Sequence, residues 1–340
     1  MLILGIESSC DETSVAVVKD GREVLSNVVL SQADIHAKYG GVVPEIASRA
    51  HTEGIYSLCE EALKKANVSL EAINAIAATY APGLIGALLV GLNFGKALAY
   101  KLNVPLIPVH HIRGHIASAY LEHKELEPAF LAFVASGGHT SIIEVSGYTQ
   151  FKLLGMTRDD AIGEAFDKIA RAMGLPYPGG AEIEKLACSG DKDGVKIPMA
   201  KVSGSELDFS FSGIKTHIIN YINKSKQKYG ISELNDEEKR NIAASFTENV
   251  TQSILIRIKR AVEVTGHEKL VCAGGVMANN HIRNALINLC EDTGVEIYIP
   301  DRKYCSDNAA MIAAQGFYEF KNGNIAELNQ NAFASMSVES

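Results

Sequence analysis

The sequence lacks the marks of a membrane or secreted protein. No apolar run is long enough to span a bilayer, and the first residues, MLILGIESSCDETS, contain no basic region and turn acidic at once. The six cysteines include no CxxC pair, which favours reduced thiols over a zinc ribbon or a disulfide framework. We therefore expect a cytoplasmic protein that does not contact a membrane.

An excess of basic charge is also missing. The net charge is −8, whereas a protein that grips nucleic acid alone usually has a strongly basic surface. Contact with nucleic acid would therefore need a local patch or a partner subunit. Lys215, Lys224, Lys226 and Lys228 are candidates for such a patch, and they fit a solvated helix end equally well.

Two common nucleotide-binding motifs are absent. Neither GxGxxG nor GxxxxGK[ST] occurs, which disfavours dinucleotide-binding and P-loop folds. The composition, with 47 % hydrophobic and 21 % charged residues over 340 positions, is that of an ordinary α/β protein large enough for two domains.

Strand and helix patterns alternate along the chain. We predict strands at 2–9, 13–18, 75–79, 105–109, 269–276 and 295–300, and helices at 44–66, 84–102, 278–292 and after Ser306, with a mainly helical stretch at 157–260. The hairpin at the start of the chain is repeated at 129–145: Ile6 to Thr13 aligns with Phe133 to Thr140. This repeat predicts two related α/β lobes.

The segment VHHIRGHIAS (109–118) contains candidate metal ligands. His111 and His115 are four residues apart, which places both on one face of a helix, and imidazoles suit iron, zinc or nickel. Ile112 stands where a zinc peptidase has its glutamate base. The pair also fits histidines in ordinary hydrogen bonds, and Asp307, a candidate third ligand, equally fits a helix cap, as does Ser306.

Glycine-rich turns are candidate nucleotide contacts. SGGHT (136–140) can aim backbone N–H groups at a phosphate, and AGGVMAN (273–279) stands between a strand and a helix. Glycines also serve simply to allow a turn. The acidic side of the helix TRDDAIGEAFDKIARAMGL (157–175) fits either a solvated face or a site that holds ribose hydroxyls.

Seven segments occur in a characteristic order over nearly the whole chain, about residues 2–320: GIESSCDETSVAVV, HHIRGH, FVASGGHTSI, TRDDAIGEAFDKIARAMGLPYPGG, FSFSGIKT, AGGVMAN and CSDNAAMIA. Together they resemble the TsaD family, the universal tRNA adenosine threonylcarbamoyltransferases, in its bacterial form. The resemblance implies the ASKHA fold of actin, Hsp70 and sugar kinases, with two ribonuclease-H-like lobes, a cleft between them and helical insertions. The lobes would comprise residues 1–128 and 129–306, with a C-terminal helix at about 307–325 packing back on the first lobe and a weakly ordered tail at 326–340.

The resemblance also implies the reaction. The enzyme would transfer threonylcarbamoyl from its adenylate to the exocyclic amine of the adenosine 3′ of the anticodon, in tRNAs that read ANN codons. One divalent metal, iron(II) or zinc, would be bound by His111, His115 and Asp307, and magnesium would accompany a nucleotide. The substrate would contact Val134, Ala135, Ser136, Gly137, Gly138, Asp167, Gly180, Glu184 and Asn279, and Asp11 and Glu12 would lie near the transferred group as candidate catalytic residues.

The implied partners are tRNA, threonylcarbamoyl-AMP made by a TsaC-type synthase, a TsaB-like paralogue and a TsaE-like ATPase. Three positions depart from the family pattern: Arg113 replaces a glutamate inside the histidine motif, Ala181 replaces a frequent proline, and Glu184 replaces an aspartate. The alternatives are a small-molecule kinase or ATPase of the same fold, a metalloprotease, and a scaffold subunit that only binds nucleotide. The missing glutamate after His111 argues against the protease.

Overall fold

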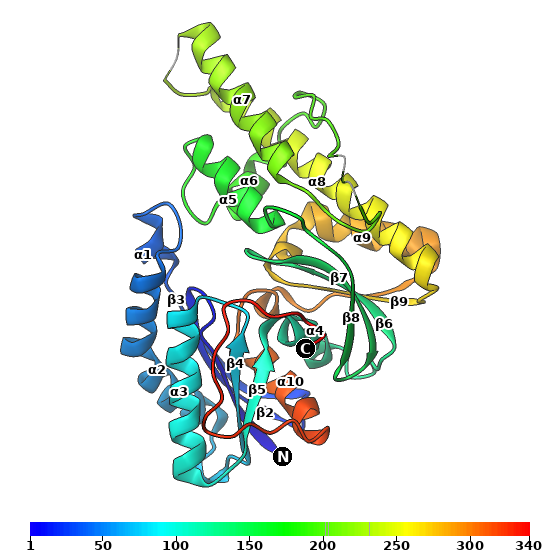
Figure 1. Ribbon diagram of the computed structural model, residues 1–340. Coiled ribbons are helices and arrows are strands. Elements are labelled where there is room, and N and C mark those ends of the chain that lie inside the picture. The colour runs from blue at the N-terminus through cyan, green and yellow to red at the C-terminus, as the bar shows by residue number, and fades with distance from the viewer. Residues whose placement is uncertain (201, 203, 231) are drawn as a thin grey trace. The chain divides into compact units, whose positions relative to one another are not determined.

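Two five-stranded sheets organise the protein, one in each of two structural units (Figure 1). The computed structural model describes residues 1–200, 202, 204–230 and 232–340, without the side chain of Tyr229. Unit 1 comprises Met1–Ala129, Val145–Lys152 and Tyr298–Ser340, and unit 2 comprises Phe130–Glu144 and Leu153–Ile297. The predicted boundaries, 1–128 and 129–306, differ from this division mainly in assigning residues 145–152 and 298–306 to the second lobe.

Unit 1 contains a sheet with the strand order β3-β2-β1-β4-β5. Its strands are β1 (Leu2–Glu7), β2 (Glu12–Lys19), β3 (Glu23–Ser31), β4 (Ala75–Ala81) and β5 (Leu106–His110). Its helices are α1 (Ala33–Ala37), α2 (Pro44–Ala66), α3 (Ile85–Leu102), α4 (His111–Glu122) and α10 (Ala309–Lys321), with short 3₁₀ turns at Leu70–Ala72 and Arg302–Tyr304. β1 pairs antiparallel with β2 and parallel with β4, and β4 pairs parallel with β5.

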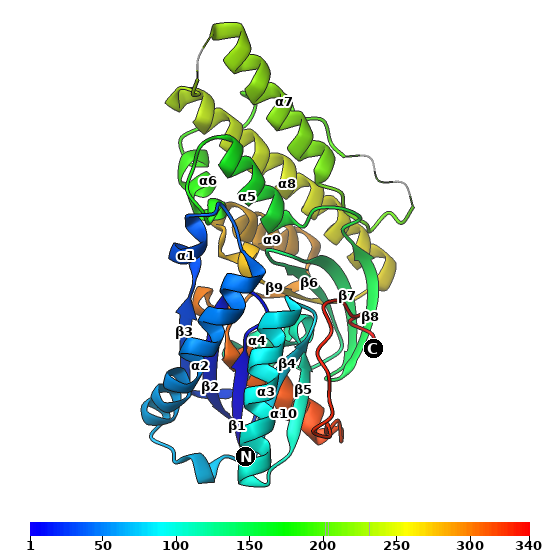
Figure 2. The same cartoon turned by 60° about the vertical axis from the view of Figure 1, so that its left-hand side comes forward.

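Helices cover both faces of this sheet (Figures 1 and 2). Leu4 and Ile6 of β1 belong to the apolar core that α2 and α3 form on one face. Gly5 points to the other face, where a Cβ atom would lie 2.2 Å from the carbonyl oxygen of Ala309 at the start of α10. The small residue at position 5 therefore allows α10 to approach the middle of the sheet.

Unit 2 contains a sheet with the order β10-β9-β6-β7-β8. Its strands are β6 (Phe130–Ala135), β7 (Thr140–Gly147), β8 (Gln150–Met156), β9 (Lys269–Ala273) and β10 (Glu296–Tyr298). Its helices are α5 (Ile162–Ala172), α6 (Gly179–Ala187), α7 (Ser212–Tyr229), α8 (Asp236–Thr265) and α9 (Asn280–Thr293), with a 3₁₀ turn at Gly275–Ala278. The 30-residue α8 begins with a capping box formed by Asn235 and Glu238, which satisfies backbone N–H groups at its start.

The two sheets have the same topology. In each, a hairpin comes first, a third strand extends it on one side, and a later strand pairs parallel with the first strand of the hairpin on the other. The α/β class and the two related lobes predicted from the repeated hairpin are therefore confirmed. The predicted strand at 269–276 ends earlier, at Ala273, because a 3₁₀ turn begins at Gly275.

The tail at 326–340, for which the sequence predicts weak order, packs on unit 1 instead. Ala326 forms a bridge with Leu106 of β5, and the backbone N–H of Phe333 donates to the carbonyl of Tyr80. The side chains of Ala332 and Val338 are buried. Ala332 and Val338 are thus buried against a surface that forms only when unit 1 folds, so the local sequence does not indicate their burial.

One helix among the described residues, α3, is long and apolar enough to cross a membrane by length and composition alone. In this structure it packs against β4 and α2 and contributes Leu88 and Leu92 to the core of unit 1.

Candidate functional site

The histidine motif is positioned by the direct passage from β5 into α4. His110 ends the strand, and its Nδ1 accepts a hydrogen bond from the N–H of Ile112, which caps the helix. A Cβ atom at Gly114 would lie 2.7 Å from the side chain of Ile312, so glycine allows α4 to pack closely on α10. His111 and His115, one turn apart on α4, are both buried.

The third candidate ligand, Asp307, precedes α10. The N-cap of that helix is Asn308, whose side chain accepts from the N–H of Met311. The interpretation of Ser306 or Asp307 as the cap is therefore wrong. Ser14 of β2 also holds the start of α10, because its Oγ accepts from the N–H of Ala309. The cap by Asn308 and the bond from Ala309 to Ser14 thus fix the start of α10, which follows Asp307 directly.

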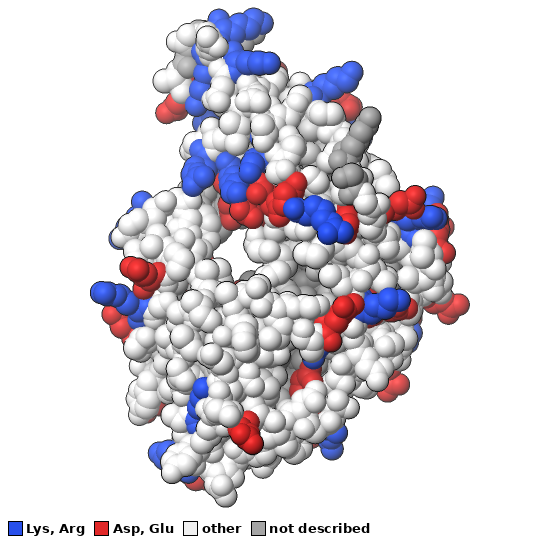
Figure 3. Space-filling model, viewed as in Figure 1, with Lys and Arg blue, Asp and Glu red and all other residues white. Residues whose placement is uncertain are grey.

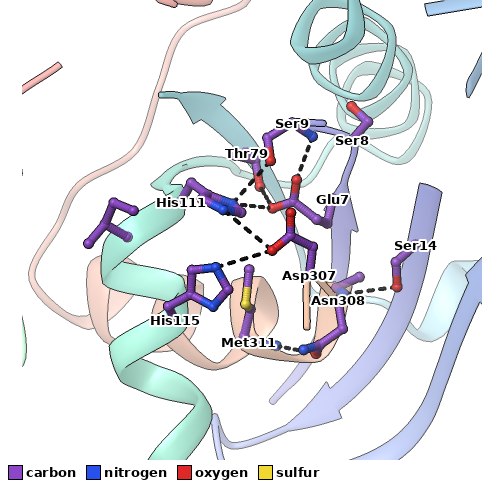
Figure 4. A network of polar contacts seen from close by, with 12 residues as sticks. Glu7, Ser8, Ser9, Ser14, Thr79, His111, His115, Asp307, Asn308 and Met311 are labelled. Carbon is purple, nitrogen blue, oxygen red and sulfur yellow. Dashed lines mark hydrogen bonds and ion pairs between the residues drawn. The ribbon is translucent and has the colours of Figure 1, made fainter. Parts of the chain in front are cut away.

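His111, His115 and Asp307 converge in unit 1 (Figure 4), and their ligand atoms lie within 4.8 Å of one another. The Oδ1 atom of Asp307 lies 3.1 Å from Nε2 of His115 and 3.6 Å from Nε2 of His111. The two rings are T-shaped, with centroids 4.6 Å apart. The i, i+4 spacing predicted that the histidines share a face, and the fold adds the aspartate from almost two hundred residues further along the chain.

The residues in this place fit a divalent metal ion. Two imidazoles and one carboxylate are a donor set that iron(II) and zinc accept in proteins. His115 is fully buried, and among the described residues neither of its ring nitrogens has a hydrogen-bond partner. Its Nε2 lies near Asp307, yet without hydrogen-bonding geometry. Since buried polar atoms are rarely left without a partner, this nitrogen is suited to bind a cation.

A fourth residue, Glu7, belongs to the same cluster and was missed from the sequence. It is the last residue of β1 and is fully buried. Its Oε2 atom lies 3.0 Å from Nδ1 of His111 and accepts a hydrogen bond from Oγ1 of Thr79 at 2.7 Å. The signal in the sequence was a carboxylate at the end of an otherwise apolar strand, LILGIE.

The charges of the cluster shift the pKa values of its members. Burial alone would lower the pKa of His111, but the carboxylates of Glu7 and Asp307 raise it to about 9. Burial alone would raise the pKa of Glu7, yet the positive charge and hydrogen bond of His111 hold it below its usual value. Burial, Asp307 and Asp11 raise the pKa of Glu12 to about 10. The concentration of carboxylates therefore favours a positive charge at this place.

The acidic turn that carries Asp11 and Glu12 is held by α2. Nε2 of His51 lies 2.9 Å from the carbonyl oxygen of Cys10, and Nδ1 lies 2.7 Å from Oγ1 of Thr13. The N–H of Gln32 donates to the carbonyl of Asp11. The charge of Asp307 raises the pKa of Glu12, which indicates that Glu12 lies near the histidine and aspartate cluster, and Asp11 precedes it in the turn.

Arg113, which replaces a glutamate of the family pattern, points to the tail of the chain. Its Nε and Nη2 atoms donate to the carbonyl of Val338 at 3.0 and 2.8 Å, and Nη1 lies 3.3 Å from Oε1 of Glu319. Its guanidinium lies 4.8 Å from the centre of the ring of Phe151. Arg113 thus secures the terminal segment, and its charge is balanced by Glu319.

In unit 2, the turn Ser136–Gly137–Gly138 meets the start of α5. The N–H groups of Gly163 and Glu164 donate to the carbonyls of Ser136 and Gly137. Gly137 and Gly138 are exposed, and a Cβ atom on either would meet nothing within 4 Å. The side chains of Val134 and Ala135 are buried in β6, so these two residues can offer a ligand only their backbone.

A series of hydrogen bonds links the other predicted contacts of unit 2. Oδ1 of Asp167 on α5 accepts from the N–H of Gly179 at the start of α6, next to Gly180. Oε1 of Glu184 on α6 accepts from both the backbone N–H and the side-chain amide of Asn280. Asn279 caps α9 by accepting from Ile282. The longer side chain of Glu184 is therefore used to reach the start of α9, while Ala181 is exposed in the first turn of α6.

The acidic residues at 159 and 160 precede α5 and form hydrogen bonds and ion pairs within unit 2. Asp159 accepts from the hydroxyls of Ser210 and Ser212 and from backbone N–H groups at the start of α7. Asp160 pairs with Lys168 at 3.1 Å and with Lys215 at 2.5 Å. Lys215 is therefore paired with an acidic residue at the start of α7. The other three lysines of the predicted patch, Lys224, Lys226 and Lys228, lie near the end of that helix.

Comparison with known proteins points to one family. Residues 23–314 match the model of TsaD, tRNA N6-adenosine threonylcarbamoyltransferase. A tRNA N6-adenosine threonylcarbamoyltransferase of Clostridium perfringens is 49 % identical over 332 residues, which cover 97 % of this chain and 96 % of that protein.

Among solved structures, full-length HypF in its phosphate- and nucleotide-bound form aligns with a TM-score of 0.62 at 17 % identity, over 98 % of this chain and 56 % of HypF. ROK hexokinase from Thermus thermophilus aligns with a TM-score of 0.52 at 15 % identity, over 95 % of this chain and all of that chain, 100 %. These likenesses show the fold, which is the ASKHA fold predicted from the resemblance.

Proposed function

The chain belongs to the TsaD family of tRNA N6-adenosine threonylcarbamoyltransferases and is an enzyme of this class, and we propose that its donor is threonylcarbamoyl-AMP. The acceptor is the exocyclic amine of the adenosine 3′ of the anticodon, in tRNAs that read ANN codons. The observation that supports this proposal most directly is the convergence of His111, His115 and Asp307 in a unit with the family's fold. Neither the kinase nor the metalloprotease alternative is favoured by the relatives.

His111, His115 and Asp307 would bind one divalent cation, iron(II) or zinc. When bound, such an ion supplies a Lewis acid that polarises a carbonyl or phosphoryl oxygen. The attacking group is a base amine, so the site needs no glutamate to activate water. This agrees with Ile112 in the place of that glutamate and with its buried side chain.

In the transfer step the amine nitrogen attacks the carbamoyl carbon, and the bond from that carbon to the phosphate oxygen of AMP breaks. The amine loses one proton, and AMP leaves with the electron pair of the broken bond. We assign the acceptance of this proton to a carboxylate of the acidic turn, Asp11 or Glu12. A cation bound by Asp307 would offset the negative charge of that residue, which is one of the causes that raise the pKa of Glu12.

The nucleotide part of the donor is assigned to unit 2. The exposed residues Gly137 and Gly138 of the turn can offer backbone N–H groups to a phosphate, with magnesium as a counterion of the nucleotide. The carboxylates of Asp167 and Glu184 and the side chain of Asn279 would accept from ribose hydroxyls or contact the base. The existing hydrogen bonds of these residues hold their helices in place for that role.

The tRNA is proposed to bind with the help of partners, because the chain is acidic overall. Lys and Arg side chains gather over the end of α7 (Figure 3), where Lys226 and Lys228 lie in the last turn. A TsaB-like paralogue and a TsaE-like ATPase would complete the enzyme in the cytoplasm, and a TsaC-type synthase would supply the adenylate.

The test is transfer of radiolabelled threonine to unmodified tRNA, with ATP, bicarbonate, an adenylate-forming synthase and the two partners. We expect label in the tRNA with the parent protein, and a fall of at least about 10³-fold with His111→Ala, since a metal ligand is lost. His267→Ala, which removes a half-buried histidine of unit 2 that pairs with Glu144, is the control. Full transfer by a folded His111→Ala protein that binds no metal would overturn the assignment of the cluster.

A further inference from the structure

We propose that Glu7 is a positioning residue for the metal site: its carboxylate accepts the Nδ1–H of His111 and thereby presents the Nε2 atom of that ring to the metal ion. This inference rests on the proposed function, because it assumes that His111, His115 and Asp307 hold a metal. It adds a residue that is not itself a ligand.

The carboxylate of Glu7 is held by contacts on both oxygens (Figure 4). The backbone N–H of Ser9 donates to Oε1 at 2.5 Å, and Oγ1 of Thr79, on the neighbouring strand β4, donates to Oε2 at 2.7 Å. The residue is fully buried at the end of β1. A carboxylate with these donors is fixed in direction and remains available as an acceptor for one more N–H group.

That further group is the His111 ring. Nδ1 lies 3.0 Å from Oε2 of Glu7, whereas Nε2 is the nitrogen on the side of Asp307 and His115. A carboxylate acceptor at Nδ1 selects the tautomer that carries its proton there, which leaves the lone pair on Nε2. The hydroxyl of Ser9, 3.2 Å from the same nitrogen, can support this orientation. A carboxylate that accepts the second ring N–H of a metal-bound histidine is a recognised arrangement. It orients the histidine and raises its basicity as a metal ligand.

The second unit provides an internal control for this interpretation. In the alignment of the two hairpins, Glu7 corresponds to Val134, which is fully buried near the end of β6. The hairpin therefore folds with an apolar residue here, and burial of a carboxylate costs free energy unless its partners compensate. Glu7 occurs in the unit that has a histidine to orient, and valine in the unit whose matching turn is built from glycines.

The experiment measures zinc affinity of the full chain by competition with a chromogenic chelator, without tRNA or partners. We expect Glu7→Gln, which keeps the size and removes the charge, to weaken zinc binding by about 10- to 100-fold. Glu319→Gln is the matched control, because Glu319 is an equally buried glutamate of unit 1 that contacts Arg113 and Gln315 rather than a ligand. Thermal unfolding in EDTA compares the stability of both variants with the parent.

Unchanged zinc affinity in a folded Glu7→Gln protein, or the same loss in Glu319→Gln, would overturn the proposal. If the parent bound zinc but transferred no threonylcarbamoyl, the transfer proposal would fail and this one would stand. A second measurement needs no variant: nitrogen NMR of histidine-labelled, zinc-loaded parent should show His111 with a proton on Nδ1 and zinc on Nε2. Coordination of zinc through Nδ1 would contradict the assignment even if Glu7→Gln did not fold.

Discussion

The first hairpin turns of the two units share a backbone plan and differ in chemistry. In unit 1 the turn from Glu7 to Glu12 carries three carboxylates next to the histidine cluster, Glu7, Asp11 and Glu12. In unit 2 the matching residues, Val134 to His139, carry no carboxylate, and Gly137 and Gly138 are exposed. One scaffold thus provides a buried place that attracts a cation and an open turn of backbone N–H groups suited to an anion.

The segments that follow β5 in unit 1 and β9 in unit 2 also differ in whether they present side chains or backbone. In unit 1, β5 leads directly into α4, whose first turn carries His111. In unit 2, β9 leads into a 3₁₀ turn that starts beyond Gly274, where φ is +95° and a Cβ atom would lie 2.3 Å from the carbonyl of Ala135. Only glycine fits there, so the backbone of unit 2 can approach its first strand closely, whereas unit 1 uses side chains.

The largest effect is expected when the carboxylate of Glu7 in unit 1 is copied to the aligned position of unit 2, Val134. We expect Val134→Glu to lower the free energy of unfolding by more than about 3 kcal/mol, because Val134 is fully buried and a charge placed there loses its hydration. Chemical denaturation with urea measures the effect. Val134→Ala is the control for lost packing alone, and equal losses in the two variants would show that the charge is tolerated.

A smaller effect is expected where the glycine turn of unit 2 meets α5. A Cβ atom at Gly163 would lie 2.8 Å from both the carbonyl oxygen of Ser136 and Cα of Gly137, so Gly163→Ala must displace the turn. We expect binding of AMP to weaken by about 10-fold or more, measured by calorimetry, since a displaced turn no longer presents its N–H groups.

Zinc affinity of Gly163→Ala should remain that of the parent, because the histidine cluster lies in unit 1. Gly213→Ala in α7 is the matched control, since its Cβ atom would meet nothing within 4 Å. An AMP affinity equal in Gly163→Ala and Gly213→Ala would separate the glycine turn from nucleotide binding.

The smallest effect concerns the histidine that holds the acidic turn of unit 1. Burial lowers the pKa of His51 from its ordinary value of 6.5, and Oγ1 of Thr13 and Nε2 of Gln32 both lie near its Nδ1. Because the folded pKa lies below the unfolded one, the stabilisation is present above about pH 6.5 and is lost as pH falls below it.

We expect His51→Gln to cost about 1 to 3 kcal/mol of unfolding free energy at pH 7.5, since the bond to the carbonyl of Cys10 is lost. The difference between parent and variant should shrink when urea denaturation is repeated at pH 5. A difference that grows on acidification would contradict the lowered pKa of His51.

Local patterns predicted much of the fold. The helix at 44–66 and the strands of the first hairpin lie where apolar periodicity and turn residues placed them, because these signals act over a few neighbouring residues. The order of the C-terminal segment was missed. It depends on the bond from Arg113 to the carbonyl of Val338 and on the backbone bond from Phe333 to Tyr80, and each bond joins residues more than two hundred positions apart in the sequence.

The candidate site was likewise predicted only in part from local patterns. The sequence by itself determined that His111 and His115 share one helical face, because a helix repeats every 3.6 residues, and that two hairpins open two similar units. Only the tertiary structure decided that Asp307 joins them and that Glu7 contacts the ring of His111, since strand pairing and the packing of α10 bring these residues together. A contact between distant segments depends on how the whole unit packs, and no local pattern encodes it.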